Sequence, residues 1–446
     1  IFILFFAVSG IILNHRELLS KVDVSRKLMP GNYRYNNWNL AAVRGQVKIS
    51  PDSILVYGNI GVWLTDSTYR QFRDFNAGFP KGIDNRKVSS MSFDRVSGLY
   101  AGTLFGLYRF ERVSGKWEEV VLPVQEKRIV KVLPVADTLL VMTRSYLLRY
   151  TSYDGFRHAE VLKVPAGEDD DGKAGLFKTL WVIHSGEIYG MIGKLIVDFI
   201  GITFIILCVT GLIYFFMPFI LKRTRNERKS RLKHFNLASL KWHNFLGSWL
   251  VIFLLLTTLT GMFLRPPLLI PIANSRVGKI PYTEMDDPNP WFDRFRDILY
   301  DDSLHRYLLA TSEGIYYSDN NFRTILVRFP SQPPVSVMGI NVFEQTGPGN
   351  YLVGSFSGIF HWKPAENLVI DGITNTPYIE TGRGGPPFGA VSVAGYLRTT
   401  GTSEIIFDYA GGALALSGSN ILPAMPGQIL DASPISLWNA SLEVHT

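Results

Sequence analysis

Residues 1–19 read IFILFFAVSGIILNHRELL, and residues 252–269 read IFLLLTTLTGMFLRPPLL. The first thirteen positions of the two stretches align without a gap. Both are runs of apolar residues with a small hydroxyl residue and a glycine near the middle, a pattern that predicts a helix in contact with lipid or with other helices. The chain therefore uses one membrane signature twice.

A second repeated segment follows in each half. Residues 176–185 (LFKTLWVIHS) align with residues 437–446 (LWNASLEVHT), which matches His184 with His445. Each half thus contains an apolar helix, a long segment without membrane character, and an aromatic segment that leads to a histidine.

The stretch 188–221 and the stretch 246–264, which contains most of the second copy quoted above, are apolar and long enough to cross about 30 Å of hydrocarbon as helices. Residues 222–241 between them hold eight Lys/Arg and one acid, Glu227, which gives +7. The whole chain also carries +7, so the remaining residues sum to zero. A short basic segment between membrane helices is typically cytoplasmic, and we expect no nucleic-acid partner.

This charge pattern predicts the domain order. We expect a first transmembrane helix with its flank at 1–19, a first external β segment at 20–175, a second helix with its histidine lead-in at 176–221, a basic cytoplasmic loop at 222–241, a third helix at 242–269, a second external β segment at 270–436, and a lead-in to a fourth helix at 437–446.

The first apolar run is short for a span, at about 20 Å as a helix. We interpret it as part of a transmembrane helix that begins upstream; a signal peptide is the alternative, although no small-residue cleavage pattern follows. The repeat predicts a fourth helix beyond Thr446 and a further histidine before Ile1.

Both external segments consist of short apolar runs separated by Gly, Pro, Asp, Asn and Ser clusters. One sequence unit recurs in both segments. It consists of an apolar run, then a turn, and then a glycine followed by alternating apolar and aromatic residues. Its six copies begin at residues 55, 99, 139, 308, 352 and 405, so that neighbours within a half are 40 to 53 residues apart. Such spacing is typical of propeller blades, each copy being a β-hairpin.

We therefore expect a helical membrane bundle joined to an all-β periplasmic domain, a six-bladed propeller built from two half-propellers. Seven blades, or two separate β-sandwiches, are the alternatives. Cys208 is the only cysteine and lies in an apolar stretch, so the external segments must be stabilised by packing rather than by disulfides.

Four of the eight histidines occur at the ends of apolar helices: His15, His184 and His445 on the external side, and His243 on the cytoplasmic side. Imidazole is a usual axial ligand of haem iron, and facing helices can hold a haem between two histidines. Two haems at two levels would form an electron path across the bilayer. The alternative is that these are ordinary interfacial histidines at helix ends.

Each apolar stretch also contains a hydroxyl residue followed by glycine, at Ser9–Gly10, Thr210–Gly211 and Thr260–Gly261. Such small residues allow close approach of another helix or of a flat macrocycle. Asp198 and Lys194, near the external start of the second helix, are expected to reach the lipid headgroups.

The motifs GIILNH after an apolar helix, IHSGEIYG before the next and KWHNFLG at the start of a third resemble the PepSY-associated transmembrane family. The resemblance covers roughly residues 1–19, 176–265 and 437–446, and the β segments do not resemble the PepSY domain.

The resemblance implies a four-helix, multi-pass protein of the bacterial inner membrane that carries haem b, in two copies, and reduces ferric siderophores or other ferric chelates in the periplasm during iron uptake. It implies haem-ligand roles for His15, His184, His243 and His445. No nucleotide-binding fingerprint is present, so electrons are expected from a quinol or a cytoplasmic-side donor, with membrane partner subunits as a further possibility.

The substrate side is less defined. The acidic run at 168–171 suits either attraction of ferric complexes or a solvated linker, and Arg383 in the Gly/Pro loop 381–390 is a candidate contact for an anionic ligand. No residue is assigned as catalytic. The rival function is a non-enzymatic one, in which a membrane-anchored propeller binds, senses or scaffolds a periplasmic partner.

Overall fold

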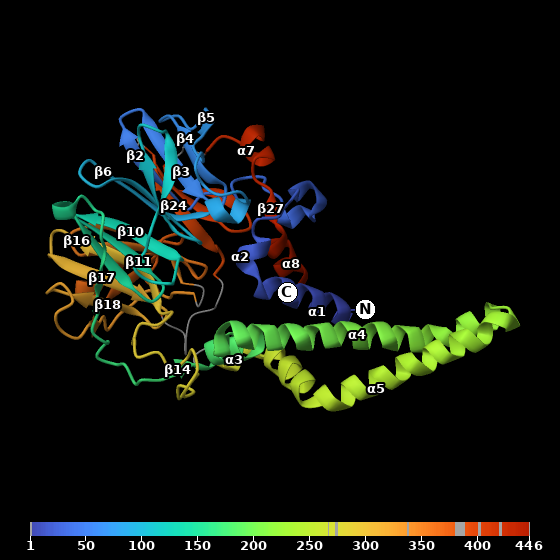
Figure 1. The fold of residues 1–446 in the computed structure, drawn as a ribbon. Coiled ribbons are helices and arrows are strands. Elements are labelled where there is room, and N and C mark those ends of the chain that lie inside the picture. Colours follow the sequence, from blue (N-terminus) through green and yellow to red (C-terminus); the bar gives the residue numbers. More distant parts are fainter. Residues whose placement is uncertain are drawn as a thin grey trace. The chain divides into compact units, whose positions relative to one another are not determined.

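The computed structural model describes residues 2–265, 267–272, 275–336, 339–379, 389–399, 403–418 and 422–445. The chain forms two compact units, each assembled from segments that are distant in sequence (Figure 1). The first, the helical unit, comprises Ile1–Leu19, Asp171–Pro288 and Leu437–Thr446, and the second, the β unit, comprises Ser20–Asp170 and Asn289–Ser436. The first β segment therefore ends before residue 175, and the second begins after residue 270.

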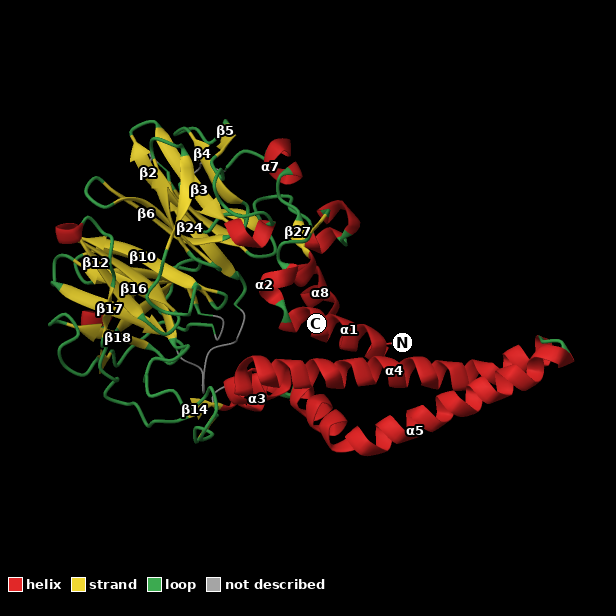
Figure 2. Ribbon diagram, in the orientation of Figure 1, coloured by secondary structure: helices red, strands yellow, loops and turns green. Residues whose placement is uncertain are grey.

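Within its described residues, the β unit contains six antiparallel sheets in which strands adjacent in sequence are also adjacent in space (Figure 2). The first sheet consists of β2 (Gly45–Ser50), β3 (Ser53–Gly58), β4 (Gly61–Thr65) and β5 (Phe72–Asp74). The second consists of β6 (Val88–Asp94), β7 (Gly98–Thr103), β8 (Leu107–Glu111) and β9 (Lys116–Val120). The third consists of β10 (Ile129–Val135), β11 (Thr138–Thr143), β12 (Leu147–Thr151) and β13 (Glu160–Leu162).

The last three sheets are built in the same way. The fourth sheet consists of β16 (Phe295–Asp301), β17 (Arg306–Thr311), β18 (Ile315–Ser318) and β19 (Val327–Arg328). The fifth consists of β20 (Ile340–Gly347), β21 (Asn350–Ser355), β22 (Gly358–Lys363) and β23 (Leu368–Asp371). The sixth consists of β24 (Val393–Arg398), β25 (Glu404–Asp408) and β26 (Gly412–Ser417). A short pair, β1 (Asp23–Val24) with β27 (Ile435–Ser436), and a short helix α7 (Gly427–Asp431) complete this unit.

The six repeated sequence units are all β-hairpins. They form the second and third strands of the six sheets, β3–β4, β7–β8, β11–β12, β17–β18, β21–β22 and β25–β26. Gly61 has φ +86° in the first hairpin and Gly412 has φ +85° in the last, a backbone conformation that favours glycine. The predicted antiparallel, β-rich external part is therefore confirmed.

The first strands of the sheets contact one another in order. β2 lies beside β6, β6 beside β10, β10 beside β16, β16 beside β20, β20 beside β24, and β24 beside β2. An apolar cluster fills each junction between neighbouring sheets. Val56 of the first sheet and Leu397 of the last share one cluster, while Leu140 of the third and Leu309 of the fourth share another. Burial of each large apolar side chain contributes about 1.5–3 kcal/mol.

The helical unit contains α1 (Phe2–Asn14), α2 (Arg16–Leu19), α3 (Leu176–Ser185), α4 (Gly190–Arg223), α5 (Asn226–Met262), α6 (Leu269–Ile272) and α8 (Leu437–His445), with a short pair of strands, β14 (Ala174–Gly175) and β15 (Arg276–Val277). Helices α4 and α5 pack against each other, and α1 packs against both α4 and α8 (Figure 1). The first expected helix thus ends at Asn14, before His15.

Among the described residues, the helix Glu187–Arg223 is long and apolar enough to cross a bilayer. A second candidate consists of Asn226–Trp249 and Val251–Met262, which meet at a bend of 68°. The bend directly follows Gly247 and Ser248, residues of the kind that accompany sharp helix kinks. Phe2–Asn14 is apolar but shorter.

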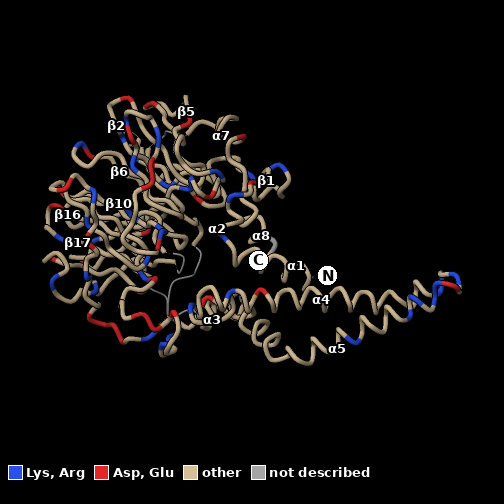
Figure 3. Tube along the Cα trace, viewed as in Figure 1, with Lys and Arg blue, Asp and Glu red and all other residues tan. Residues whose placement is uncertain are grey.

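The basic segment 222–241 differs from its prediction as a loop. Helix α4 continues to Arg223 and α5 begins at Asn226, so nearly the whole segment is helical. Its Lys and Arg positions are coloured blue along the trace at the end of the α4–α5 hairpin in Figure 3. Lys, Arg, Leu and Ala favour helices, and only Thr224 and Arg225 form the connection. The third expected helix also ends early, at Met262 rather than at residue 269.

Candidate cofactor-binding site at the histidines

The four predicted histidines all lie in the helical unit. His184 is on α3, His445 on α8 and His243 on α5, while His15 occupies the junction between α1 and α2. All four side chains are half-buried. Three of them contact a Ser/Thr–Gly pair, by which we mean Ser9–Gly10, Thr210–Gly211 or Thr260–Gly261.

His184 is held by the third Ser/Thr–Gly pair, on α5. Its Nδ1 lies 3.0 Å from the backbone oxygen of Thr257 and 3.2 Å from Oγ1 of Thr260. A carbonyl oxygen can only accept, so Nδ1 carries the proton and Nε2 keeps its lone pair. A β-carbon added at Gly261 would lie 2.9 Å from Cε1 of His184, so glycine is needed for the imidazole to approach the helix this closely.

His445 has the same relation to α1. Its Nδ1 lies 2.8 Å from Oγ of Ser9, and that hydroxyl donates its own proton to the carbonyl of Phe5 at 2.7 Å. The serine oxygen must then accept from Nδ1 of His445. The ring also packs edge-on against Phe6, with centroids 5.5 Å apart, and lies next to Gly10.

His243 on α5 repeats the arrangement with a residue pair of α4. Its Nδ1 lies 2.9 Å from Oγ1 of Thr210, which donates to the carbonyl of Ile206 at 2.7 Å. A β-carbon at Gly211 would lie 3.6 Å from the His243 ring. In all three histidines, therefore, Nδ1 is the donor, and Nε2 makes no hydrogen bond to any described residue.

His15 has a different environment. Its Nε2 lies 2.6 Å from Oδ2 of Asp198 on α4, and the other carboxylate oxygen accepts from the side-chain amide of Asn14 at 3.0 Å. Asp198 is buried at 8% exposure, so it does not extend to lipid headgroups as expected from the sequence. Lys194, the other predicted headgroup contact, pairs with Glu187 at 3.0 Å.

Burial favours the neutral form of His184 on α3 and His445 on α8, which lie outside the candidate spans α4 and α5. It lowers the pKa of His184. Burial, together with the nearby His184 and Arg265, also lowers the pKa of His445. A neutral imidazole with a free Nε2 is the form that binds a metal.

These features fit haem iron. A metal-binding histidine commonly donates its second ring nitrogen to a carbonyl or another acceptor, which fixes the tautomer and the ring orientation. The described residues contain no group of three or more His, Cys, Asp or Glu side chains able to hold a metal ion, as a zinc site would require. A haem needs only one or two protein ligands, so separated histidines on facing helices suit it better.

Sequence reasoning located the histidines and the Ser/Thr–Gly pairs separately. It assigned the pairs to helix packing or to a macrocycle and missed their hydrogen bonds to the imidazoles. The available signal was the occurrence of three hydroxyl–glycine pairs beside four helix-end histidines, but which pair meets which histidine depends on which helices are neighbours.

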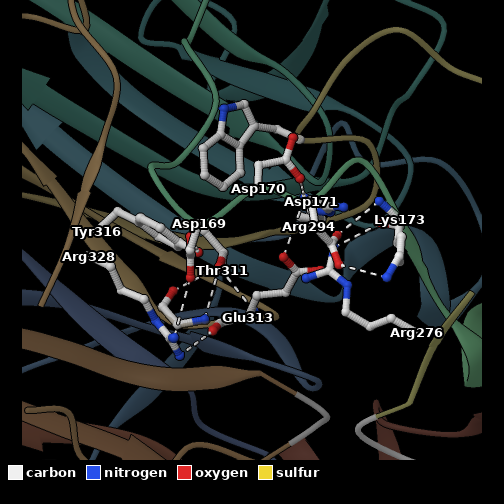
Figure 4. Close-up of polar contacts among 12 residues, drawn as sticks. Asp169, Asp170, Asp171, Lys173, Arg276, Arg294, Thr311, Glu313, Tyr316 and Arg328 are labelled. Carbon is white, nitrogen blue, oxygen red and sulfur yellow. Dashed lines mark hydrogen bonds and ion pairs between the residues drawn. The ribbon is translucent and has the colours of Figure 1, made fainter. Parts of the chain in front are cut away.

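Arg383 and most of the loop 381–390 lie outside the described residues. The acidic run 168–171, in contrast, is described and is largely neutralised by arginines (Figure 4). In the β unit, Arg294 pairs with Asp170 at 3.0 Å, and Arg328 pairs with Asp169 at 3.3 Å. The run is therefore not a free cluster of carboxylates, and Glu168, Asp169 and Asp171 remain exposed to solvent.

A long apolar helix and a large antiparallel β unit fit a membrane protein with a β-rich domain. The family model described as the PepSY-associated TM region matches residues 118–307, a range that includes α3, α4 and α5. Residues 118–307 are therefore similar to the PepSY-associated TM family, and a membrane-spanning helix in this range implies contact with the lipid bilayer.

Several solved structures are similar over much of the chain. The extracellular domains of two putative hybrid two-component systems from B. thetaiotaomicron have TM-scores of 0.42 and 0.36 at 10% and 12% identity. Each match includes 85% of this chain, but this chain covers only 33% of the first structure and 40% of the second. PorZ of the type-IX secretion system of Porphyromonas gingivalis has a TM-score of 0.22 at 8% identity, and the match covers 82% of this chain and 44% of PorZ. No curated protein matched the chain.

Proposed function

We propose that this chain is a haem-containing electron-transfer protein of the bacterial inner membrane, which reduces ferric siderophores or other ferric chelates in the periplasm. The observation that carries the proposal is the repeated histidine geometry. His184, His243 and His445 each direct Nδ1 to an acceptor on a neighbouring helix and leave Nε2 without a partner among the described residues.

The residues suggest two cofactor sites. His184 and His445, which occupy equivalent positions in the two halves of the sequence, are the candidate ligands of an external haem b, and His243 is the candidate ligand of a cytoplasmic-side haem b. Bound haem would supply a one-electron Fe(III)/Fe(II) couple. We assign His15 a positioning role, because its Nε2 is bonded to Asp198. The chain's own residues fix the ring orientations, and burial favours the neutral forms of His184 and His445 by lowering their pKa.

The basic segment supports the orientation in the membrane. Lys and Arg residues at 222–241 cluster where α4 and α5 meet, and short basic segments stay cytoplasmic. We propose that the helical unit is multi-pass, with the β unit in the periplasm. The net reaction adds one electron to a ferric chelate and gives the ferrous form. The electron comes from a quinol or from a donor on the cytoplasmic side. Membrane partner subunits are further candidate partners.

We also propose that the six sheets of the β unit are the blades of a six-bladed propeller formed by both halves. The supporting observation is the cyclic order of contacts between first strands, from β2 through β24 and back to β2. The junctions β10–β16 and β24–β2 join different halves through shared apolar clusters, which two separate sandwiches would not do.

The first test is the visible spectrum of the purified chain. The proposal predicts a Soret band that shifts on addition of dithionite, whereas a colourless, folded protein would contradict it and favour a membrane-anchored binding or scaffold protein. Haem per chain should fall by about half in His243→Ala, because only one of two sites loses its ligand. His361→Ala, in β22 of the other unit, is the control and should retain all haem.

The pairing of ligands has its own test. If His184 and His445 share a haem, His184→Ala, His445→Ala and the double variant should each lose the same haem. Adding His243→Ala should remove the other. Additive losses in the His184/His445 double variant would show that the two residues serve different sites.

A further inference from the structure

The β unit contains a cavity of about 510 Å³ at the junction of its first two sheets. Twelve residues line it: Ile49, Phe75, Phe93, Arg95, Val96, Ser97, Gly98, Leu99, Arg109, Phe110, Glu111 and Arg112. They come from β2, from the end of β5, and from the β6–β7 and β8–β9 hairpins. Cavities of 300–1,000 Å³ suit small organic ligands.

The apolar part of the lining is aromatic. Phe75 and Phe110 stack with ring centroids 4.6 Å apart and an interplanar angle of 29°. Both rings also pack against Trp117, at 6.2 Å and 5.3 Å. Trp117 is buried and donates its indole N–H to the carbonyl of Phe75 at 2.8 Å. This network holds the aromatic side chains in place before any ligand arrives.

The polar part of the lining is dominated by three arginines, Arg95, Arg109 and Arg112, against one acid, Glu111. All three arginines are exposed, and none lies within 4.0 Å of a carboxylate oxygen among the described residues. Arg109 extends over the ring of Tyr100 at 5.8 Å. The lining therefore carries a net positive charge beside aromatic rings.

The neighbouring carboxylates are engaged elsewhere. Asp94 Oδ2 accepts from the backbone amides of Val96 at 2.7 Å and Ser97 at 2.9 Å, so it caps the β6–β7 turn. Glu111 Oε1 accepts from the amide of Val113 at 3.1 Å in the β8–β9 turn. Each turn thus uses its own acid and leaves its arginine available to a ligand in the cavity.

We propose that this cavity binds a small aromatic oxyanion, such as a phenol carboxylate. The ring would pack against Phe75 and Phe110, and the anionic oxygens would accept from the guanidinium groups at the rim. Guanidinium groups form charge-assisted, often bidentate hydrogen bonds with carboxylates, and also interact favourably with aromatic rings. The proposal concerns the β unit alone and is independent of the electron-transfer proposal.

Isothermal titration calorimetry of the full detergent-solubilised chain with salicylate tests the site. Acetate, which lacks the ring, and benzyl alcohol, which lacks the charge, should bind more weakly than salicylate. Arg95→Gln and Arg109→Gln should each weaken salicylate binding about fivefold, since each removes a charge-assisted contact. Raising the salt concentration should weaken binding as well.

Arg73→Gln is the matched control, because Arg73 is an exposed arginine of β5 that does not line the cavity. It should leave salicylate binding unchanged. The proposal is overturned if salicylate does not bind at millimolar concentration, if benzyl alcohol or acetate binds as tightly, or if the two cavity variants match Arg73→Gln. All three substitutions are at exposed positions, and circular dichroism checks that the variants remain folded.

Discussion

Ser9, Thr210 and Thr260 each donate a hydroxyl proton to the carbonyl one turn earlier in their own helix. This leaves the hydroxyl oxygen as an acceptor pointing away from the helix axis. The following glycine provides the space in which an imidazole can reach that oxygen. Two adjacent small residues thus suffice to position a histidine from another helix.

The closest of these contacts predicts the effect of one methyl group. A β-carbon at Gly261 would lie 2.9 Å from Cε1 of His184, whereas one at Gly10 would lie 3.5 Å from Cε1 of His445. Gly261→Ala must therefore displace the His184 ring, while Gly10→Ala makes an ordinary van der Waals contact.

We expect Gly261→Ala to weaken haem binding about tenfold, the effect typical of disturbing the groups that orient a ligand. Gly10→Ala should bind haem as the unmodified chain does. Titration of haem into the apoprotein, monitored at the Soret band, measures both. Equal affinities for the two variants would contradict the role assigned to Gly261.

At the level of elements, Asp301 links two neighbouring sheets. It lies at the end of β16, where Oδ1 accepts from the backbone amides of Ser303 and Leu304 in the β16–β17 turn. Its Oδ2 accepts from the hydroxyl of Tyr351 on β21 at 2.7 Å and from the amide of Gly349 at 3.0 Å. One buried carboxylate thus closes a turn and joins the fourth sheet to the fifth.

These contacts make stability depend on pH. Burial raises the pKa of Asp301, but the hydrogen bonds from Ser303, Tyr351, Gly349 and Leu304 outweigh it and lower the pKa to about 2. Because the folded pKa lies below the unfolded value of about 4, the stabilisation is present above pH 4 and is lost as pH falls towards 2.

Asp301→Asn should lower the free energy of unfolding by about 2 kcal/mol at pH 7, and the difference from the unmodified chain should shrink between pH 4 and pH 2. Chemical unfolding at several pH values measures this difference. Asp302→Asn, at the exposed adjacent position, is the control and should have little effect. A penalty that does not change between pH 4 and pH 2 would exclude a role for the Asp301 charge.

At the scale of the whole β unit, the two halves of the chain depend on each other. Backbone approach is very close where β24 meets β2, since a β-carbon on Gly395 would contact the carbonyl oxygen of Val43 and the backbone of Arg44. Only glycine fits at this position. The contact joins residues about 350 positions apart in sequence, and it completes the cycle of sheet contacts.

Gly395→Val should therefore open the junction between the last and first sheets. We expect it to destabilise the β unit by more than about 2 kcal/mol, because backbone atoms cannot move aside as a flexible side chain can. Thermal unfolding and limited proteolysis measure the loss. Gly106→Ala, where a β-carbon makes only contacts of 3.5 Å or more, should be tolerated; comparable destabilisation by both would contradict the argument.

The local pattern of the sequence was sufficient for much of this structure. Each repeated unit predicted its own hairpin, because apolar alternation and a glycine at the turn are properties of about ten adjacent residues. The charge at 222–241 marked where α4 and α5 meet but was wrongly taken for a loop, since Lys and Arg suit a helix as well as a loop. The end of the first helix before His15 agrees with the sequence, where the apolar run stops at Leu13.

The sequence by itself determined the hairpins, the long apolar helices and the histidines that terminate them, because each depends on near neighbours. Only the tertiary structure decided that Ser9 meets His445, that Thr260 meets His184, and that Asp198 meets His15. These contacts join residues between 76 and 436 positions apart, and their hydrogen bonds form only after helix packing has brought the partners together.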